Sequence, residues 1–127
     1  MMKKFFLPIL LFSLTGCLNN VEDVAGEVQI EVSFSNDVQP ILIANNCVGC
    51  HTSGSLDLST YQSIINSSGP QYGQNIIVIG DADASGLVDK IESNPQSGGR
   101  MPQGGPFLSG DEIQTIRAWI NEGALNN

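Results

Sequence analysis

The sequence contains little histidine, little cysteine and little positive charge. It has one histidine and three cysteines, and its five lysines and arginines stand against thirteen aspartates and glutamates. With one histidine, the chain alone cannot provide two histidine ligands to one metal ion. The shortage of positive charge argues against nucleic acid as a partner and against electrostatic attachment to anionic lipid. An acidic surface instead favours partners with a positively charged face, although the same charge also keeps a protein soluble.

A long hydrophobic run is absent except at the N-terminus. There Lys3 and Lys4 precede an apolar stretch, residues 5–12, which is interrupted only by Pro8. This run is too short to cross a bilayer as a helix. Its basic flank and the small residues that follow it are typical of a secretory signal peptide.

The signal-like segment ends in Leu14-Thr15-Gly16-Cys17. This tetrapeptide resembles the bacterial lipobox, which implies cleavage before Cys17 and lipidation of that residue. An ordinary signal peptide cut elsewhere is the alternative, and it would leave Cys17 as a free thiol in an exported protein. We therefore expect a lipoprotein signal peptide over residues 1–16, the lipidated cysteine and a flexible acidic tether over residues 17–33, and one folded domain over residues 34–127.

Hydrophobic periodicity predicts several helices in this domain. The clearest begins after Ser109, which is placed as an N-cap with Glu112 completing a capping box, and it ends before Gly123. Apolar residues recur at helical spacing between these two signals. Shorter helices are expected at three other places, with their starts marked by Asn36, Ser59 and Asp83.

The rest of the domain is rich in glycine and proline. Residues 94–106 contain four glycines and three prolines and are expected to form a loop, and the apolar residues 75–80 are expected to be extended chain. Short helices and long loops bury little apolar surface for the entropy that is lost on folding. An apolar group inside the domain would resolve this shortfall.

The segment at residues 45–54 brings Cys47, Cys50 and His51 together in the sequence. A thioredoxin-like dithiol needs a Cys-x-x-Cys beside a βαβ sheet, which this sequence does not predict. A structural zinc site needs four ligands, and these residues are too few, with Cys50 and His51 awkwardly adjacent. A disulfide between Cys47 and Cys50 would leave His51 unexplained.

The spacing Cys-x-x-Cys-His is the attachment motif of c-type haem. In such a site the two thiols bond to the two vinyl groups of the porphyrin, and the imidazole of the next residue binds the iron. We therefore expect one covalently bound haem c on Cys47, Cys50 and His51. The haem would also supply the missing apolar group, and the export signal agrees with it because this attachment takes place outside the cytoplasm.

Met101 is expected to be the second axial ligand of the iron. Once the signal peptide is removed it is the only methionine, and it lies in the glycine- and proline-rich loop before the last helix. His/Met ligation raises the potential of a haem relative to ligation by two histidines. The alternative is that Met101 fills core space, but its neighbours Arg100 and Pro102 belong to a loop.

Together these features resemble the class I monohaem cytochromes c. The resemblance covers residues 34–124 and rests on Phe34 with residues 37–42, on the haem motif, on Met101-Pro102 and on the last helix. It implies an all-α fold, the small cytochrome c fold, in which about four short helices and long loops wrap around one covalently bound haem. Residues 79–82, Ile-Gly-Asp-Ala, depart from the Pro-Gly-Asp-Pro that relatives often carry.

The resemblance also predicts the surroundings of the haem. Arg100 is the residue that we expect to donate to a haem propionate, because it is the only cation beside a ligand. The other candidate donors are Tyr61, Tyr72 and Trp119. The apolar residues expected to wall the haem are Ile41, Leu42, Leu56, Leu58, Tyr61, Ile64, Ile76, Ile79, Leu87, Ile91, Ile116 and Trp119.

The expected function is that of a membrane-tethered single-electron carrier and not of an enzyme, because a six-coordinate haem exchanges electrons with little rearrangement. The alternatives are a haem subunit of a larger redox complex, or a sensor of CO or NO in which Met101 is displaceable. The expected partners are redox proteins with a positively charged docking face, and the membrane through the lipid on Cys17. The expected location is a bacterial cell envelope, on the periplasmic side or the outer surface. The lack of an acidic residue directly after Cys17 favours the outer membrane.

Overall fold

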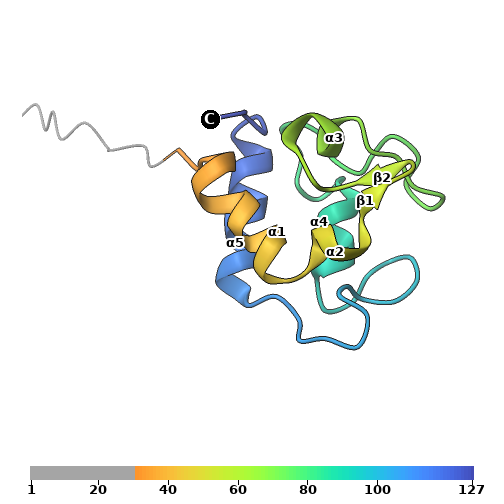
Figure 1. Cartoon of the computed structure of the whole chain (residues 1–127). Helices are drawn as coiled ribbons and strands as arrows, with labels where there is room; N and C mark the ends of the chain where they lie inside the picture. Colours follow the sequence, from red (N-terminus) through yellow and green to blue (C-terminus); the bar gives the residue numbers. More distant parts are fainter. Residues whose placement is uncertain (1–30) are drawn as a thin grey trace, which may run out of the picture.

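The computed structural model describes residues 31–127, and the predicted signal peptide and the lipidation site Cys17 lie outside the described residues. Figure 1 shows α1 and α5 at one end of the domain, with α3 and a small hairpin at the other. In chain order the elements are η1 (Phe34–Val38, a π-helical turn), α1 (Gln39–Ala44), α2 (Cys47–Cys50), β1 (Thr52–Ser53), β2 (Leu56–Asp57), α3 (Tyr61–Ile65), α4 (Gly86–Ile91) and α5 (Gly110–Asn121).

The prediction of a mostly helical domain with long loops is confirmed, but a two-stranded hairpin and the one-turn helix α2 were not predicted. Strands β1 and β2 are antiparallel, and Ser53 pairs with Leu56. The two residues between them are Gly54 and Ser55, and Gly54 has a φ of 78°. A tight two-residue turn requires positive φ, which glycine adopts without a steric penalty. Residues 75–80, expected to be extended, form no strand and run mostly through turns.

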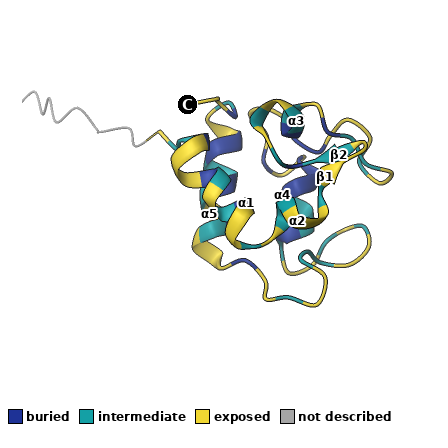
Figure 2. Cartoon of the chain, viewed as in Figure 1, coloured by how far each residue is buried: buried dark blue, intermediate teal, exposed yellow. Residues whose placement is uncertain are grey.

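A single core cluster of buried apolar residues runs through the domain, and part of it lies where η1 packs against α5, whose buried sides face one another in Figure 2. Three aromatic residues, Phe34, Tyr61 and Trp119, meet there, and the ring centroids of Phe34 lie 5.4 Å from those of the other two. The Trp119 indole N–H donates to the Leu125 carbonyl at 2.9 Å, and the Tyr61 hydroxyl donates to the Ala124 carbonyl at 2.9 Å. The chain after α5 is therefore fixed to the same aromatic cluster.

Helix α5 begins as predicted. The Ser109 hydroxyl accepts from the Glu112 amide, and the Glu112 carboxylate accepts from the Ser109 amide at 2.7 Å, so the capping box is complete. Gly123 follows the helix with a φ of 110°, which only glycine adopts easily. Among the helices of residues 31–127, none has the length and hydropathy needed to cross a bilayer.

Replacing Ser109 with alanine is expected to lower the free energy of unfolding by about 1 kcal/mol, because it removes the acceptor for one of the unpaired amides at the start of α5. Chemical denaturation of Ser109→Ala beside the wild type measures the change. Ser53→Ala, at an exposed position in β1, is the control and should change stability by less than about 0.5 kcal/mol. Equal stability of all three proteins would contradict the role of the cap.

The other helices begin at different residues from those predicted. Ser33, and not Asn36, caps η1, and Thr60, one residue after the predicted Ser59, caps α3. Ser85 occupies the N-cap position of α4 without a capping hydrogen bond from its side chain, and Asp83, the expected cap, instead pairs with Arg117 of α5. A carboxylate near a helix start can serve either role, and the sequence alone does not show that an arginine lies within reach.

Residues 31–33, which the sequence analysis assigned to the tether, are hydrogen-bonded to the last residues of the chain. The Val32 amide donates to the Glu122 carboxylate at 2.8 Å, and the Ser33 hydroxyl donates to the Asn127 carbonyl at 2.9 Å. The chain thus enters the domain beside the end of α5. In Figure 1 this entry lies at the far end of the domain from the hairpin.

Candidate functional site

Cys47 and Cys50 form the first and last residues of the single helical turn α2. Residues three apart on a helix lie on the same face, so the two side chains project from one side of the turn. His51 leaves the helix with a φ of −113° and a ψ of 70°, while its amide still donates to the Cys47 carbonyl at 3.0 Å. The three predicted residues are therefore presented together by one turn and its end.

The neighbouring residues hold this turn in place. The Asn45 side chain donates to the Ile41 carbonyl and to the Glu112 carboxylate, both at 3.0 Å, which connects the end of α1 with the start of α5. On the other side, the His51 carbonyl accepts from the Leu58 amide at 2.7 Å. The Cys-x-x-Cys-His segment is thus fixed between the α1–α5 pair and the hairpin.

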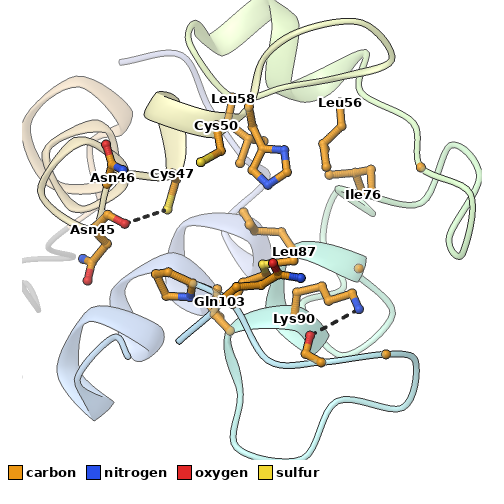
Figure 3. A pocket seen from close by; sticks show the side chains of 18 of the residues that line it. Asn45, Asn46, Cys47, Cys50, Leu56, Leu58, Ile76, Leu87, Lys90 and Gln103 are labelled. Carbon is orange, nitrogen blue, oxygen red and sulfur yellow. Dashed lines mark hydrogen bonds between the residues drawn. The ribbon is translucent and has the colours of Figure 1, made fainter. Parts of the chain in front are cut away.

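A cavity of about 870 Å³ lies against this segment, and Figure 3 shows Cys47 and Cys50 beside it. Cys47, Cys50, His51 and Met101 all line the cavity, although Met101 comes from the loop between α4 and α5, fifty residues after His51. Its volume falls within the roughly 300–1,000 Å³ of pockets that hold drug-sized molecules. The structure therefore brings together the four residues that the sequence analysis selected as the haem site.

The walls of the cavity are largely apolar. The predicted wall residues that line it are Leu56, Leu58, Ile76, Leu87 and Ile91. The prediction was wrong for Ile79, which is 58% exposed and lies outside the cavity. The remaining predicted wall residues pack in or against the hydrophobic core and do not line the cavity: Ile41, Leu42, Tyr61, Ile64, Ile116 and Trp119. Helical periodicity identified them as buried but could not show which residues of the single core cluster also face the cavity.

Arg100 does not line the cavity, which corrects its predicted role as a donor to a propionate. Its Nε donates to the Ile91 carbonyl at 2.8 Å, and its guanidinium carbon lies 4.3 Å from the centroid of the Phe107 ring. Of the other predicted donors, Trp119 and Tyr61 use their polar atoms on the chain after α5, and only Tyr72 lines the cavity.

Two polar residues of the cavity, Lys90 and Gln71, were missed by the sequence analysis. Lys90 follows Asp89 on α4, and the Asp89 carboxylate accepts from the Tyr72 hydroxyl at 2.5 Å. Burial and this hydrogen bond raise the pKa of Tyr72 to about 12. Burial alone would raise the pKa of Asp89, but the hydrogen bonds from Tyr72 and from the amides of Gln96 and Ser97 outweigh it and hold the pKa below its ordinary value. In the sequence, Lys90 was distinguished only by being a cation near the end of a predicted helix.

The alternatives to haem find less support in the geometry. Within residues 31–127, no group of three or more histidine, cysteine or acidic side chains is arranged to hold a metal ion. Both Cys47 and Cys50 are free thiols. Burial raises the pKa of the Cys47 thiol, whereas the reactive cysteine of a dithiol redox site has a lowered pKa.

The residues of this cavity fit a c-type haem. A covalently held haem needs two thiols on one face of a turn, an imidazole next to them and an apolar pocket, and each of these is present at the cavity. A thioether is a known second axial ligand, and Met101, which lines the same cavity, would be the residue to supply one.

Comparisons with known proteins give only distant structural similarity. No protein family and no curated protein matches the sequence. Among solved structures, the chain is similar to hydrazine synthase of Kuenenia stuttgartiensis, with 25% sequence identity and a TM-score of 0.48. The match covers 73% of this chain and 16% of that chain. Because this likeness is so weak, we base neither the fold nor the function on it.

Proposed function

We propose that this protein is a single-electron carrier with one covalently bound haem c. Cys47 and Cys50 would hold the haem through thioether bonds, and His51 and Met101 would be the axial ligands of its iron. When bound, the haem supplies an iron centre that gains or loses one electron. The proposal rests above all on the cavity of about 870 Å³ that these four residues line together.

The chain's own residues would bind and shield the cofactor. The apolar side chains of Leu58, Ile76 and Leu87 exclude water from one side of the cavity, which favours a large flat apolar group over a small polar substrate. The thiols and the imidazole come from a turn that is fixed at both ends, so the attachment side is rigid. A site that holds the iron on both sides leaves no position for a substrate, which favours a carrier over an enzyme.

The charge distribution supports a partner with a basic docking face. The three cations of residues 31–127 all have internal partners: Lys90 and Arg100 donate to backbone carbonyls, and Arg117 pairs with Asp83 and Glu92. Acidic side chains such as Asp111 remain exposed. A redox partner with a positive face would be attracted to this surface.

We further propose that the domain is anchored in a bacterial cell envelope by a lipid on Cys17, on the periplasmic side or the outer surface. A tether of this kind would keep the domain near its membrane-bound redox partners and raise its effective concentration there. The motif at residues 14–17 supports this proposal, together with the requirement that c-type haem is attached outside the cytoplasm.

Replacing Met101 with alanine is expected to open the iron to CO. The reduced wild type should have a c-type visible spectrum that CO leaves unchanged, because both axial positions are taken. Reduced Met101→Ala should have a spectrum that CO shifts. Visible spectra of both proteins, reduced and then exposed to CO, make the measurement.

Gln103→Ala provides the control, because Gln103 lines the same cavity from the same loop but offers no axial ligand. It should behave like the wild type. If CO shifted the wild-type spectrum, the sixth position would be open and a sensor or the haem subunit of a catalytic complex would be the better proposal. A protein purified from cells that attach c-type haem, yet without a haem spectrum, would refute the haem proposal.

A further inference from the structure

The loop that carries Met101 has little means of holding its own shape. Between α4 and α5 it contains no helix or strand, and it includes Gly98, Gly99, Gly104 and Gly105. Glycine-rich chain loses much conformational entropy when it is fixed, so a defined position for Met101 requires contacts from outside the loop. The structure provides them almost entirely from one end of α4.

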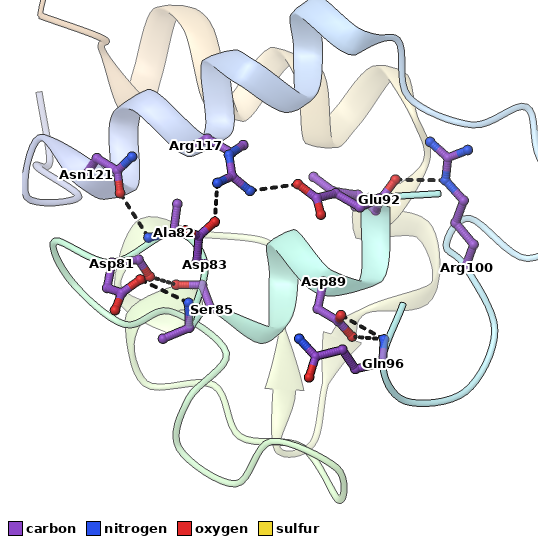
Figure 4. Close-up of polar contacts among 12 residues, drawn as sticks. Asp81, Ala82, Asp83, Ser85, Asp89, Glu92, Gln96, Arg100, Arg117 and Asn121 are labelled. Atoms are coloured by element: carbon purple, nitrogen blue, oxygen red, sulfur yellow. Dashed lines mark hydrogen bonds and ion pairs between the residues drawn. The ribbon is translucent and has the colours of Figure 1, made fainter. Parts of the chain in front are cut away.

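Three consecutive residues of α4 bind successive residues of this loop. The Asp89 carboxylate accepts from the Gln96 amide at 2.8 Å, as Figure 4 shows. The Lys90 ammonium donates to the Ser97 carbonyl and, at 3.4 Å, to the Gly99 carbonyl. Figure 3 shows this side chain at the edge of the cavity.

The backbone of the same helix continues the pattern. The Lys90 carbonyl accepts from the Met101 amide at 2.8 Å, and the Ile91 carbonyl accepts from Arg100 Nε at 2.8 Å. Lys90 therefore contacts the loop on both sides of Arg100, with its side chain at residues 97 and 99 and with its backbone at Met101. No other residue between 31 and 127 contacts Met101 and the glycines before it in this way.

Two further features make this contact specific. Gly98 has a φ of 68°, and a Cβ at this position would lie 2.9 Å from Lys90 Nζ and 3.1 Å from Gln71 Nε2. The positive φ favours glycine here, and a larger residue would also push the ends of the Lys90 and Gln71 side chains aside. On the other side of Asp89, the Tyr72 hydroxyl donates to the carboxylate, and the Tyr72 ring lies against Gly86 at the start of α4.

Helix α4, which carries Asp89 and Lys90, is itself fixed to the core. Arg117 of α5 bridges Asp83 and Glu92, which lie on either side of α4, and Figure 4 shows both contacts. The Arg117 side chain is 21% exposed, whereas those of Asp83 and Glu92 are 84% and 42% exposed, so this bridge is open to solvent and holds α4 only weakly. The buried residues Leu87, Val88 and Ile91 fix α4 in the core, and the helix presents Asp89 and Lys90 to the loop.

We propose that Lys90 and Asp89 are positioning residues that hold the 96–101 loop and thereby set the place of Met101 at the cavity. The inference about the iron rests on the proposed function, because Met101 matters to the iron only if a haem is bound. The contacts of Asp89 and Lys90 with this loop, here called the Lys90 clamp, do not themselves depend on the haem. If the clamp is released, the loop can move and an added ligand can displace Met101 from the iron. Lys90 would therefore determine whether the iron is closed to external ligands.

Two variants test the clamp in different ways. Lys90→Met removes the ammonium group but keeps an unbranched apolar side chain. Gly98→Ala keeps the charge of Lys90, but it strains the loop backbone at a positive φ and crowds the Lys90 ammonium group. Gln114→Glu, at an exposed position of α5, changes the net charge by the same amount as Lys90→Met and serves as the control.

Amide hydrogen exchange in the folded proteins provides the first measurement. The Gln96 and Met101 amides should exchange at least about tenfold faster in Lys90→Met and in Gly98→Ala than in the wild type and in Gln114→Glu, because hydrogen bonds to a charged donor stabilise a local structure by roughly that factor or more. Unchanged exchange at both amides in both variants would overturn the proposal. If one variant fails to fold, the other still decides the question.

CO binding to the reduced proteins is the second measurement. CO should shift the spectra of Lys90→Met and Gly98→Ala but not those of the wild type and Gln114→Glu. If exchange becomes faster while the variants stay inert to CO, Lys90 holds the loop but does not control Met101, and the proposal is refuted in that respect. A wild type without haem, or one that binds CO, would refute the proposed function instead, and the exchange result would still decide whether the clamp exists.

Discussion

Replacing both Cys47 and Cys50 with alanine is expected to abolish the covalent retention of haem completely. The two thiols lie on one helical turn at the wall of the cavity, and no other cysteine lies within residues 31–127. Each single variant keeps one thiol and should keep part of the covalently attached haem. The measurement is extraction of the purified proteins with acidified organic solvent, which removes haem that is not covalently bound.

The wild type should keep its colour in the protein fraction, and the double variant should lose all of it to the solvent. Ser53→Ala, two residues after His51 in β1, is the control for a change close to the motif and should retain the haem as the wild type does. A double variant that keeps its haem would show that the thiols are not the attachment points. Zinc in the wild type that is lost from the double variant would instead favour the metal-site alternative.

The Cys-x-x-Cys-His motif could be found from the sequence because it is local. Cys47, Cys50 and His51 lie within five consecutive positions, and one helical turn places the two cysteines on a shared face. The capping box of α5 is local in the same sense, since Ser109 and Glu112 are three residues apart. Met101 was predicted in a different way, by elimination, because few other residues could serve as a ligand.

Several of the predictions that failed concern which distant segments meet. Arg100 was assigned to a propionate because it is next to Met101, but its side chain is turned to the Ile91 carbonyl and the Phe107 ring. Asp83 was expected to cap a helix and instead pairs with Arg117, 34 residues away. Hydrophobicity alone cannot show whether a buried residue faces the cavity or the helix pair.

The hairpin and the Lys90 clamp were missed for two further reasons. The hairpin is so short that its pattern extends over only two residues in each strand, although the turn Gly54-Ser55 was a usable signal. The clamp depends on backbone carbonyls of a loop, and these are the same in every sequence. Only the folded arrangement shows that Ser97 and Gly99 present theirs to Lys90.

Replacing Trp119 with alanine is expected to cause the largest loss of stability, about 3–5 kcal/mol, because it leaves a large cavity in the core. Trp119 is 1% exposed and packs against Phe34 and Tyr61, and its indole N–H binds the Leu125 carbonyl. It therefore joins η1, α3, α5 and the chain after α5. Since a domain of this kind is typically stable by only about 5–15 kcal/mol, the change would remove a large part of the total.

Chemical denaturation of Trp119→Ala, Trp119→Phe and the wild type measures this loss and divides it. Trp119→Phe keeps an aromatic ring but loses the hydrogen bond, so it should fall between the other two. Ile43→Ala, at a position that is 57% exposed, is the control and should change the free energy of unfolding by no more than about 0.5 kcal/mol. A loss below about 1 kcal/mol in Trp119→Ala would contradict the proposed packing.

The same variant also tests whether the core around Trp119 affects the cavity. Trp119 does not line the cavity, although the sequence analysis placed it in the haem wall. Under conditions in which Trp119→Ala is still folded, its haem content and the response of its reduced spectrum to CO should therefore equal those of the wild type. If the spectrum changed while the protein stayed folded, the aromatic cluster would be coupled to the cavity through the apolar core that both share, and the expectation drawn from the cavity lining would be wrong.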